Sequence, residues 1–185
     1  MGNNKKNSDL YVGKSVRTLE GKGPVAGTAK YTNDFNFDGQ LHAHILRSPH
    51  ASADIKSIDT SAAEKISGVV KVLTGEEAAK YIDPIPHYID PTGLGGKVAT
   101  IRCLALDYVW CYGQPVAVVV AEEKRIAQYA VSKINVDYDV KDPVIDPALA
   151  LRDDAKPVVR DWDSNLITQL PFSNGDPEKA INSAD

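Results

Sequence analysis

Three of the four histidines in the chain lie between residues 42 and 50, the sharpest gathering of chemically versatile side chains in the sequence. His42 and His44 are two residues apart, so on a β-strand both imidazoles point to the same face. Such a pair can chelate zinc or copper, and His50 adds a third ligand only if the chain folds back. No cysteine or carboxylate stands beside them at ligand spacing. Surface or interface histidines are therefore the favoured interpretation, and we predict no metal site.

A second candidate is the glycine-rich stretch from Gly93 to Lys97, which is similar in composition to a phosphate-binding loop. A Walker loop ending at this lysine needs glycine where Pro91 stands, and Ser or Thr where Val98 stands. The dinucleotide-binding pattern of three glycines after a strand is also missing. We therefore predict a flexible loop that binds no phosphate.

Acidic residues and cysteines complete the set of possible chemical groups. A carboxylate pair can perform acid–base chemistry or hold a cation, but the alternation of residues 134–140 favours a solvated strand face instead. The acidic residues concerned are Asp137, Asp139, Asp142 and Asp146. Cys103 and Cys111 form no C-x-x-C pair, so free thiols are favoured over a structural disulfide. Cys111, beside a buried strand, fits a small core thiol. We predict no catalytic, cofactor-binding or metal-binding residue in this chain.

Composition is that of an ordinary globular protein. The 185 residues are 43% hydrophobic and 25% charged, with a formal net charge of -4. This mild acidity gives no attraction to nucleic acid or anionic lipid, and no apolar run is long enough to cross a bilayer. The first residues carry lysines but no apolar stretch, so they are not a secretory signal. We predict a cytoplasmic protein with a disordered lead-in over residues 1–10.

Apolar patterning predicts a mixed sheet with short helices, an α+β fold. Alternation or β-branched runs predict strands over residues 29–32, 41–46, 53–58, 69–74, 115–121 and 134–140. Helical spacing and capping residues predict helices over 62–66, 76–81 and 122–133. In the strand over 41–46, the face that carries Ala43 and Ile45 is the apolar one. Residues 115–121, apolar on both faces, are expected to be central and fully buried.

Two arrangements of these elements follow. We expect residues 41–46 and 53–58 to pair as antiparallel neighbours. We also expect one right-handed crossover from residues 115–121, through the helix, to residues 134–140.

Two segments lack periodicity. The loop over residues 83–100 is too long and irregular for an ordinary connection, so we expect it to dock on another part of a larger protein. The segment from residue 153 to 173 is polar and extended, and the tail after Asp153 is a second candidate for such docking. Asp176 and Pro177 then begin a helix as N-cap and first helical residue, and the chain ends nine residues after that cap. Such a short helix is not stable alone, so we expect a chain cut short at Asp185.

Seven stretches, in this order, resemble the start of the molybdenum-containing large subunit of the xanthine dehydrogenase, aldehyde oxidase and carbon monoxide dehydrogenase family. They are Gly13–Val16, Gly27–Asp34, Leu46–Ala51, Ile55–Ser61, Gly68–Gly75, Tyr112–Val119 and Gly175–Ala180. Each stretch alone is weak, but the ordered set is specific and covers nearly the whole chain from Tyr11 onward. The sequence departs from the family at Gln114, where the family often has Glu. It also departs at His42 and His44, where basic or aromatic residues are common, which weakens any metal-binding role of these histidines.

The resemblance implies an α/β-hammerhead domain over residues 11–150. It further implies that residues 151–185 form an extended connector and the truncated start of a molybdopterin-binding region. Members of the family hydroxylate purines, aldehydes or N-heterocycles with oxygen from water. They use molybdopterin, two iron–sulfur clusters and often FAD. The partners implied are the remaining molybdopterin-binding domains, an iron–sulfur subunit and an FAD subunit.

The resemblance thus leads to a non-catalytic structural domain of a molybdenum hydroxylase, inactive as an isolated chain. A free-standing assembly or binding module with the same fold is the first alternative, and a small metal-binding protein built on the three histidines is the second. The substrate and the electron acceptor are not encoded in these residues, because the resemblance places the substrate pocket in the rest of the enzyme.

Overall fold

The computed structural model describes residue 11, residues 13–172 and residues 174–184. The chain divides into two units, residues 1–40 and 41–185. The predicted disordered lead-in over residues 1–10 lies outside the described residues.

The first unit contains two short helical elements, α1 (Lys22–Val25) and η2 (Thr32–Asp34). The strand predicted over residues 29–32 is wrong. Asp34 accepts a hydrogen bond from the Tyr31 amide at 2.9 Å and closes a turn there. Local bonds of this kind compete with strand pairing, and they win here because no described residue of the unit is buried.

The second unit begins with a three-stranded antiparallel sheet in the order β1 (His42–Arg47), β5 (Pro115–Ala121) and β3 (Val69–Thr74). The central position predicted for residues 115–121 is confirmed. Full burial on both faces is confirmed only at the start of the strand, where Val116 and Ala117 have no exposed surface. Ala117, Val119 and Ala121 have no exposed surface, whereas Val118 and Val120 on the opposite face are partly exposed.

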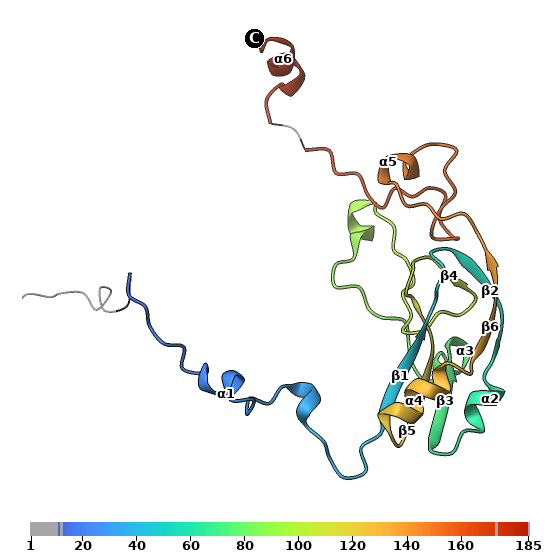
Figure 1. Ribbon diagram of the computed structural model, residues 1–185. Coiled ribbons are helices and arrows are strands. Elements are labelled where there is room, and N and C mark those ends of the chain that lie inside the picture. Colours follow the sequence, from blue (N-terminus) through green and yellow to red (C-terminus); the bar gives the residue numbers. More distant parts are fainter. Residues whose placement is uncertain (1–10, 12, 173, 185) are drawn as a thin grey trace, which may run out of the picture. The chain divides into compact units, whose positions relative to one another are not determined.

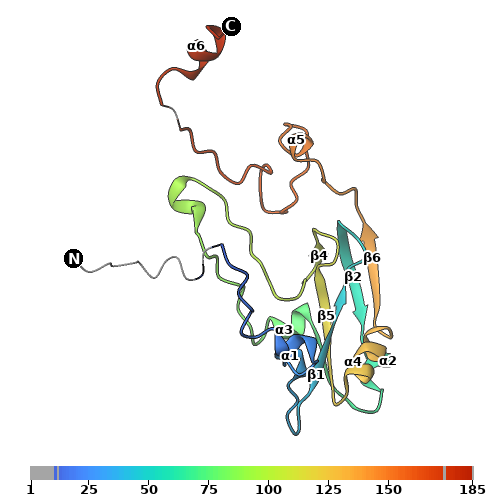
Figure 2. The same ribbon diagram turned by 60° about the vertical axis from the view of Figure 1, so that its left-hand side comes forward.

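A second antiparallel sheet has the order β4 (Tyr108–Val109), β2 (Ala53–Asp59) and β6 (Asn135–Val140) (Figure 2). The predicted pairing of residues 41–46 with 53–58 is therefore wrong, because β1 and β2 belong to different sheets. The predicted crossover is wrong for the same reason, since β5 and β6 are also separated. The Ser48 amide donates to the Gln114 carbonyl at 2.9 Å, and its hydroxyl accepts from the His50 amide. This turn therefore leads the chain away from β1 instead of folding it back as a hairpin.

Helix α4 (Lys124–Val131) covers one face of the first sheet and lies across β1 and β5 (Figure 1). Its buried residues Ala130 and Val131 pack in one cluster with Val72 and Val119. Burying such side chains contributes about 1.5–3 kcal/mol each for the larger ones, which makes this cluster the main stabilising element. Two shorter helices, α2 (Ser61–Glu64) and α3 (Gly75–Ala78), flank β3.

Three further short elements lie outside the sheets: η3 (Pro91–Leu94), α5 (Pro147–Ala150) and α6 (Pro177–Asn182). The helix start predicted at Asp176 is confirmed, since its carboxylate accepts from the Lys179 amide at 3.0 Å. The α+β class with short helices is also confirmed, with two antiparallel sheets in place of a single mixed one. Among the described residues, no helix is long and apolar enough to cross a membrane.

Candidate functional site

The histidines do not converge on one point. His42 and His44 lie on β1, on the same face as Leu46, which packs against the cluster beneath α4. The expected apolar face of this strand is therefore reversed, because Ala43 and Ile45 are the exposed residues. The His50 ring stands edge-on to another ring, that of Tyr138, at 5.0 Å between centroids. In the described part of the chain, no group of three or more His, Cys, Asp or Glu side chains could hold a metal ion.

The acidic residues near β6 serve local structure. Lys141 donates to Asp139 at 2.7 Å, and this hydrogen bond holds the pKa of that carboxyl below its usual range. Asp146 caps α5 by accepting from the amides of Ala148 and Leu149. Asp139 and Asp146 therefore have local structural roles. Asp137 and Asp142 make no side-chain hydrogen bond or ion pair within the described residues.

Both cysteines are free thiols with exposed side chains. The expectation that Cys111 is a core thiol is therefore wrong. It lies in the turn that precedes β5, where Gln114 bonds back to the Cys111 carbonyl and Gly113 has a left-handed φ of 81°. The turn directs its side chain away from the buried strand, although the two are adjacent in sequence.

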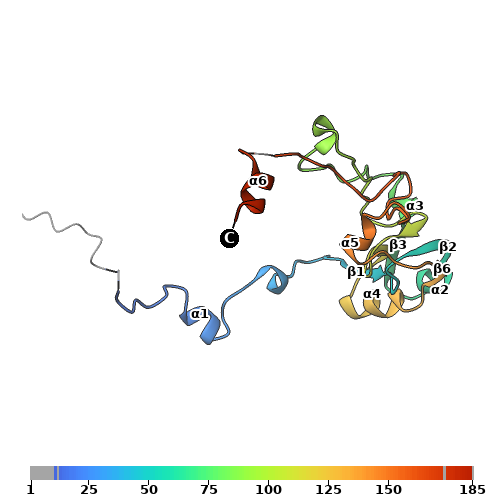
Figure 3. The ribbon, with the colours of Figure 1, turned by 90° about the horizontal axis from the view of Figure 1, so that it is seen from above.

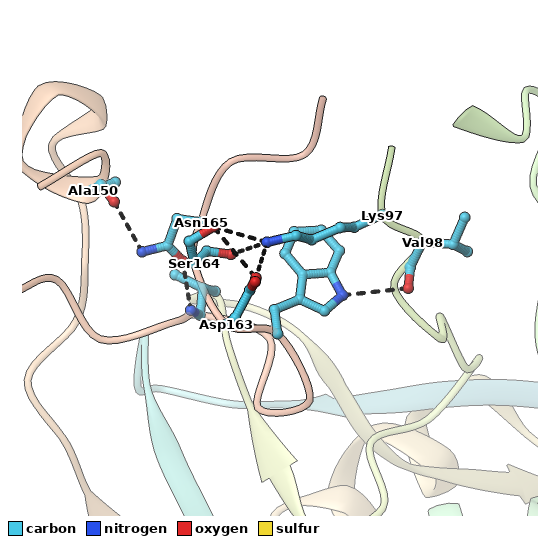
Figure 4. A network of polar contacts seen from close by, with 8 residues as sticks. Lys97, Val98, Ala150, Asp163, Ser164 and Asn165 are labelled. Carbon is cyan, nitrogen blue, oxygen red and sulfur yellow. Dashed lines mark hydrogen bonds and ion pairs between the residues drawn. The ribbon is translucent and has the colours of Figure 1, made fainter. Parts of the chain in front are cut away.

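The glycine-rich stretch is held by the tail of the same chain. The Lys97 ammonium donates to Asp163 and, at 2.8 Å, to the Ser164 hydroxyl. The Lys97 amide also donates to the Ile167 carbonyl at 2.8 Å. Figure 4 shows the ammonium directed at Asp163 and Ser164. The loop was expected to be flexible, but the Lys97 ammonium and amide hold its end on the tail.

An indole ring completes this contact, which we name the loop–tail clamp (Lys97 and Val98 with Trp162, Asp163 and Ser164). The Trp162 ring lies 5.7 Å from the Lys97 ammonium, and its N–H donates to the Val98 carbonyl at 3.4 Å. Exposed ion pairs of this kind contribute at most about 1 kcal/mol each. Lys97 also holds the pKa of Asp163 below its usual range, through the hydrogen bond between them. The clamp therefore positions the loop more than it stabilises the fold.

Two side chains fix the tail itself. Asn165 bonds to three backbone groups, namely the carbonyls of Ala150 and Lys156 and the amide of Val158. Arg160 pairs with Asp54 on β2 and stacks on the Tyr108 ring of β4 at 4.1 Å. Burial raises the pKa of Tyr108 above its usual value. The polar pattern of residues 153–173 gave no sign of this anchoring, because these contacts follow no helical or strand period and the partner of Arg160 on β2 is distant in sequence.

Together the loop and the tail expose many apolar side chains, and in Figure 3 the two segments run beside each other. Tyr88 and Phe172 are 101% and 95% exposed, values that leave these rings without any cover. Large exposed apolar patches on proteins mark interaction sites. We name this set the docking surface: Ile82, Ile85, Tyr88, Ile89 and Leu94 from the loop, and Leu166, Ile167, Leu170 and Phe172 from the tail.

The docking surface is the strongest candidate functional site in the described residues. The irregular composition of residues 83–100 pointed to the loop. The prediction that the tail after Asp153 docks as well pointed to the other half, although the apolar residues of the tail follow no helical or strand period. Docking of the loop on parts outside this chain stays a prediction, since the contacts seen here are internal and hold only its base.

Comparison with known proteins gives a consistent result. Residues 26–142 match the family described as aldehyde oxidase and xanthine dehydrogenase, a/b hammerhead domain. The chain is 35% identical over 175 residues to the nicotine 6-hydroxylase large subunit of Paenarthrobacter nicotinovorans, covering 94% of this chain and 21% of that protein.

Two solved structures have the same fold. The aldehyde oxidoreductase from Desulfovibrio gigas aligns with a TM-score of 0.75 and 25% identity, over 90% of this chain and 19% of that one. A copper- and molybdenum-containing carbon monoxide dehydrogenase aligns with a TM-score of 0.63 and 31% identity, over 78% of this chain and 17% of that one. The chain thus spans about a fifth of the length of each of these proteins.

Proposed function

Because the chain belongs to the aldehyde oxidase and xanthine dehydrogenase hammerhead-domain family, we propose that it is the non-catalytic structural domain of a molybdenum hydroxylase. The single observation that carries this proposal is the docking surface, which joins exposed apolar groups to a fold that has a core of its own. The complete enzyme would hydroxylate a purine, aldehyde or N-heterocycle with oxygen from water.

The cofactors of that enzyme do not fit the residues present here. An iron–sulfur cluster takes four cysteine ligands, and this chain has two cysteines. The glycine-rich loop that could have cradled a phosphate is occupied by its own lysine contacts. Molybdopterin, the iron–sulfur clusters and FAD would therefore be bound by other domains or subunits, which are the proposed partners. The assembly is proposed to be cytoplasmic.

The domain boundaries belong to the same proposal. Residues 11–150 would form the hammerhead domain, and residues 151–185 the connector and the start of the molybdopterin-binding region. The Arg160 and Asn165 contacts support an ordered connector that stays bound to the domain as far as the docking surface. A free-standing assembly module with the same fold remains the alternative function.

Coexpression tests the proposal directly. The tagged chain and the molybdopterin-binding region of the same enzyme are produced as two polypeptides and copurified. We expect a stoichiometric complex that contains molybdenum, which the tagged chain alone does not. Tyr88→Ser with Ile89→Ser should weaken copurification, while the matched exposed change Val70→Ser on β3 should not. A stable chain that never copurifies would favour the free-standing module.

A further inference from the structure

A second surface, separate from the docking surface, carries arginines without acidic partners. Arg102 is half-buried, yet it has no hydrogen bond or ion pair within the described residues. Arg47 donates to the Gly113 carbonyl at 2.9 Å and has no carboxylate partner there either. An arginine without an anionic partner keeps N–H donors that match the two oxygens of a carboxylate.

Both arginines line one groove of about 620 Å³ between the end of β1 and the turn before β5. Trp110, Tyr112 and Gln114 also line it. Tyr112 is 76% exposed at its rim, so the groove is open to a large partner and is not an enclosed ligand cavity. We name it the arginine groove.

The wall of the arginine groove is rigid. The Gly113 amide donates to the Ser48 carbonyl at 2.9 Å, and the Trp110 amide donates to the Gln114 side chain at the same distance. Ser48 is 2% exposed, which ties this turn to the buried end of β1. A preordered wall costs a partner less entropy on binding than a mobile loop.

The charge of the groove favours an anion. Its lining contains Arg47, Arg102 and Arg160 together with Asp107 and Asp161. Arg160 and Asp107 pair with each other at 3.5 Å, and Arg160 also pairs with Asp54. The groove therefore presents two arginines free of carboxylates against one exposed aspartate, Asp161.

We propose that the arginine groove binds a carboxylate-bearing segment of the molybdopterin-binding polypeptide. Arginine binds carboxylates through paired hydrogen bonds, and arginine, tryptophan and tyrosine are the residue types that dominate binding energy at interfaces. An acidic side chain would satisfy Arg102, while the neighbouring segment packs against Trp110 and Tyr112. This inference rests on the proposed function, because it takes the partner from the same enzyme.

The experiment uses the two-polypeptide copurification, with the dissociation constant measured by titration. Arg102→Glu should weaken binding at least about a hundredfold, because a like charge replaces the pair. Arg102→Lys should lose about tenfold, since an ammonium cannot make the paired bonds. Lys124→Glu on α4 introduces the same charge change at an exposed position and should bind as the original chain does. Circular dichroism of each variant alone establishes that the fold is intact.

The outcomes separate the two proposals. An original chain that fails to bind overturns the proposed function. Binding by the original chain and equal binding by Arg102→Glu overturns only the arginine groove. A chain that instead forms its own dimer, detected by light scattering and broken by Arg102→Glu, also overturns it, because the occupant would then be a second copy.

Discussion

The sheet beneath α4 and the loop–tail region are held together by opposite means. Beneath α4, fully buried side chains such as Val119 and Ala130 make the contacts, and hydrophobic burial supplies the stability. In the loop–tail region, Lys97, Trp162 and Asn165 supply hydrogen bonds, while the apolar side chains face outward. The first region buries its apolar side chains, whereas the second leaves many of them exposed.

The difference separates stability from function in this fold. A substitution in the first region should change the free energy of unfolding, whereas one in the second should change local order or assembly. The four predictions below test that separation, beginning with the largest effect.

Gly75→Ala should destabilise the protein most. A Cβ at this position would overlap the Ala105 carbonyl oxygen, which is backbone and cannot turn away. Overpacking of this kind costs about 3 kcal/mol, measured by urea unfolding. Gly93→Ala is the matched control, because nothing lies within 4 Å of a Cβ added there. Equal losses in the two variants would contradict the packing described for α3.

Val119→Ala should lower the free energy of unfolding by about 2 kcal/mol, because it leaves a cavity under α4. Val119 has no exposed surface, whereas Val70 on β3 is 53% exposed. Val70→Ala should therefore change stability by less than about 0.5 kcal/mol in the same urea titration. If both substitutions lower the free energy of unfolding equally, α4 does not bury this face of the sheet.

Trp162→Ala should release the loop from the tail and leave global stability nearly unchanged. Hydrogen exchange at the Lys97 amide, which donates to the Ile167 carbonyl, should accelerate about fivefold. Urea unfolding should shift by less than about 1 kcal/mol. Tyr129→Ala removes an exposed aromatic ring from α4, away from the clamp, and should leave hydrogen exchange at the Lys97 amide unchanged. A global loss in the Trp162 variant would place the clamp in the core.

The smallest effect concerns acid pH. The pKa of Asp163 lies below its usual value of 3.8 because Lys97 donates to it. Because the pKa of Asp163 is lower in the folded chain than in the unfolded chain, its pair with Lys97 contributes its full stabilisation at any pH above the unfolded-state pKa. That contribution is lost only as the pH falls through the lowered value.

The stability of the loop–tail clamp should accordingly be constant from about pH 5 to 8 and should decrease below about pH 4. The chemical shift of the Lys97 amide, followed against pH, would report this loss of the clamp. Asp163→Asn should abolish the transition at acid pH. Asp161→Asn serves as a neighbouring control. A transition near neutral pH would assign the clamp to another group.

Local signals in the sequence identified most elements. The structure contains five of the predicted strands and the helix after residue 122, because alternation and helical spacing depend only on residues close together in the sequence. The strands are those over residues 41–46, 53–58, 69–74, 115–121 and 134–140. The two-residue strand β4 was missed, since two residues carry no period. The strand over 29–32 failed because a single aspartate closed a turn that the pattern could not reveal.

Pairing and exposure were the harder part. The sequence suggested that β1 and β2 are neighbours, but their assignment to different sheets depends on the Ser48–Gln114 contact across 66 residues. The turn before β5 leaves Cys111 exposed, against the expectation from its neighbours in sequence. Docking by the loop and by the tail was expected from their irregular composition, whereas the contact between these two segments was not.

The sequence by itself determined the α+β class, the central strand over residues 115–121, the helix start at Asp176 and the family. Each of these depends on residues that are close along the chain or occur in a fixed order. Only the tertiary structure decided which strands share a sheet, which face of β1 is covered and which residues hold Lys97. Those outcomes depend on contacts between residues that are far apart in sequence. A local sequence pattern cannot predict the free energies of such contacts.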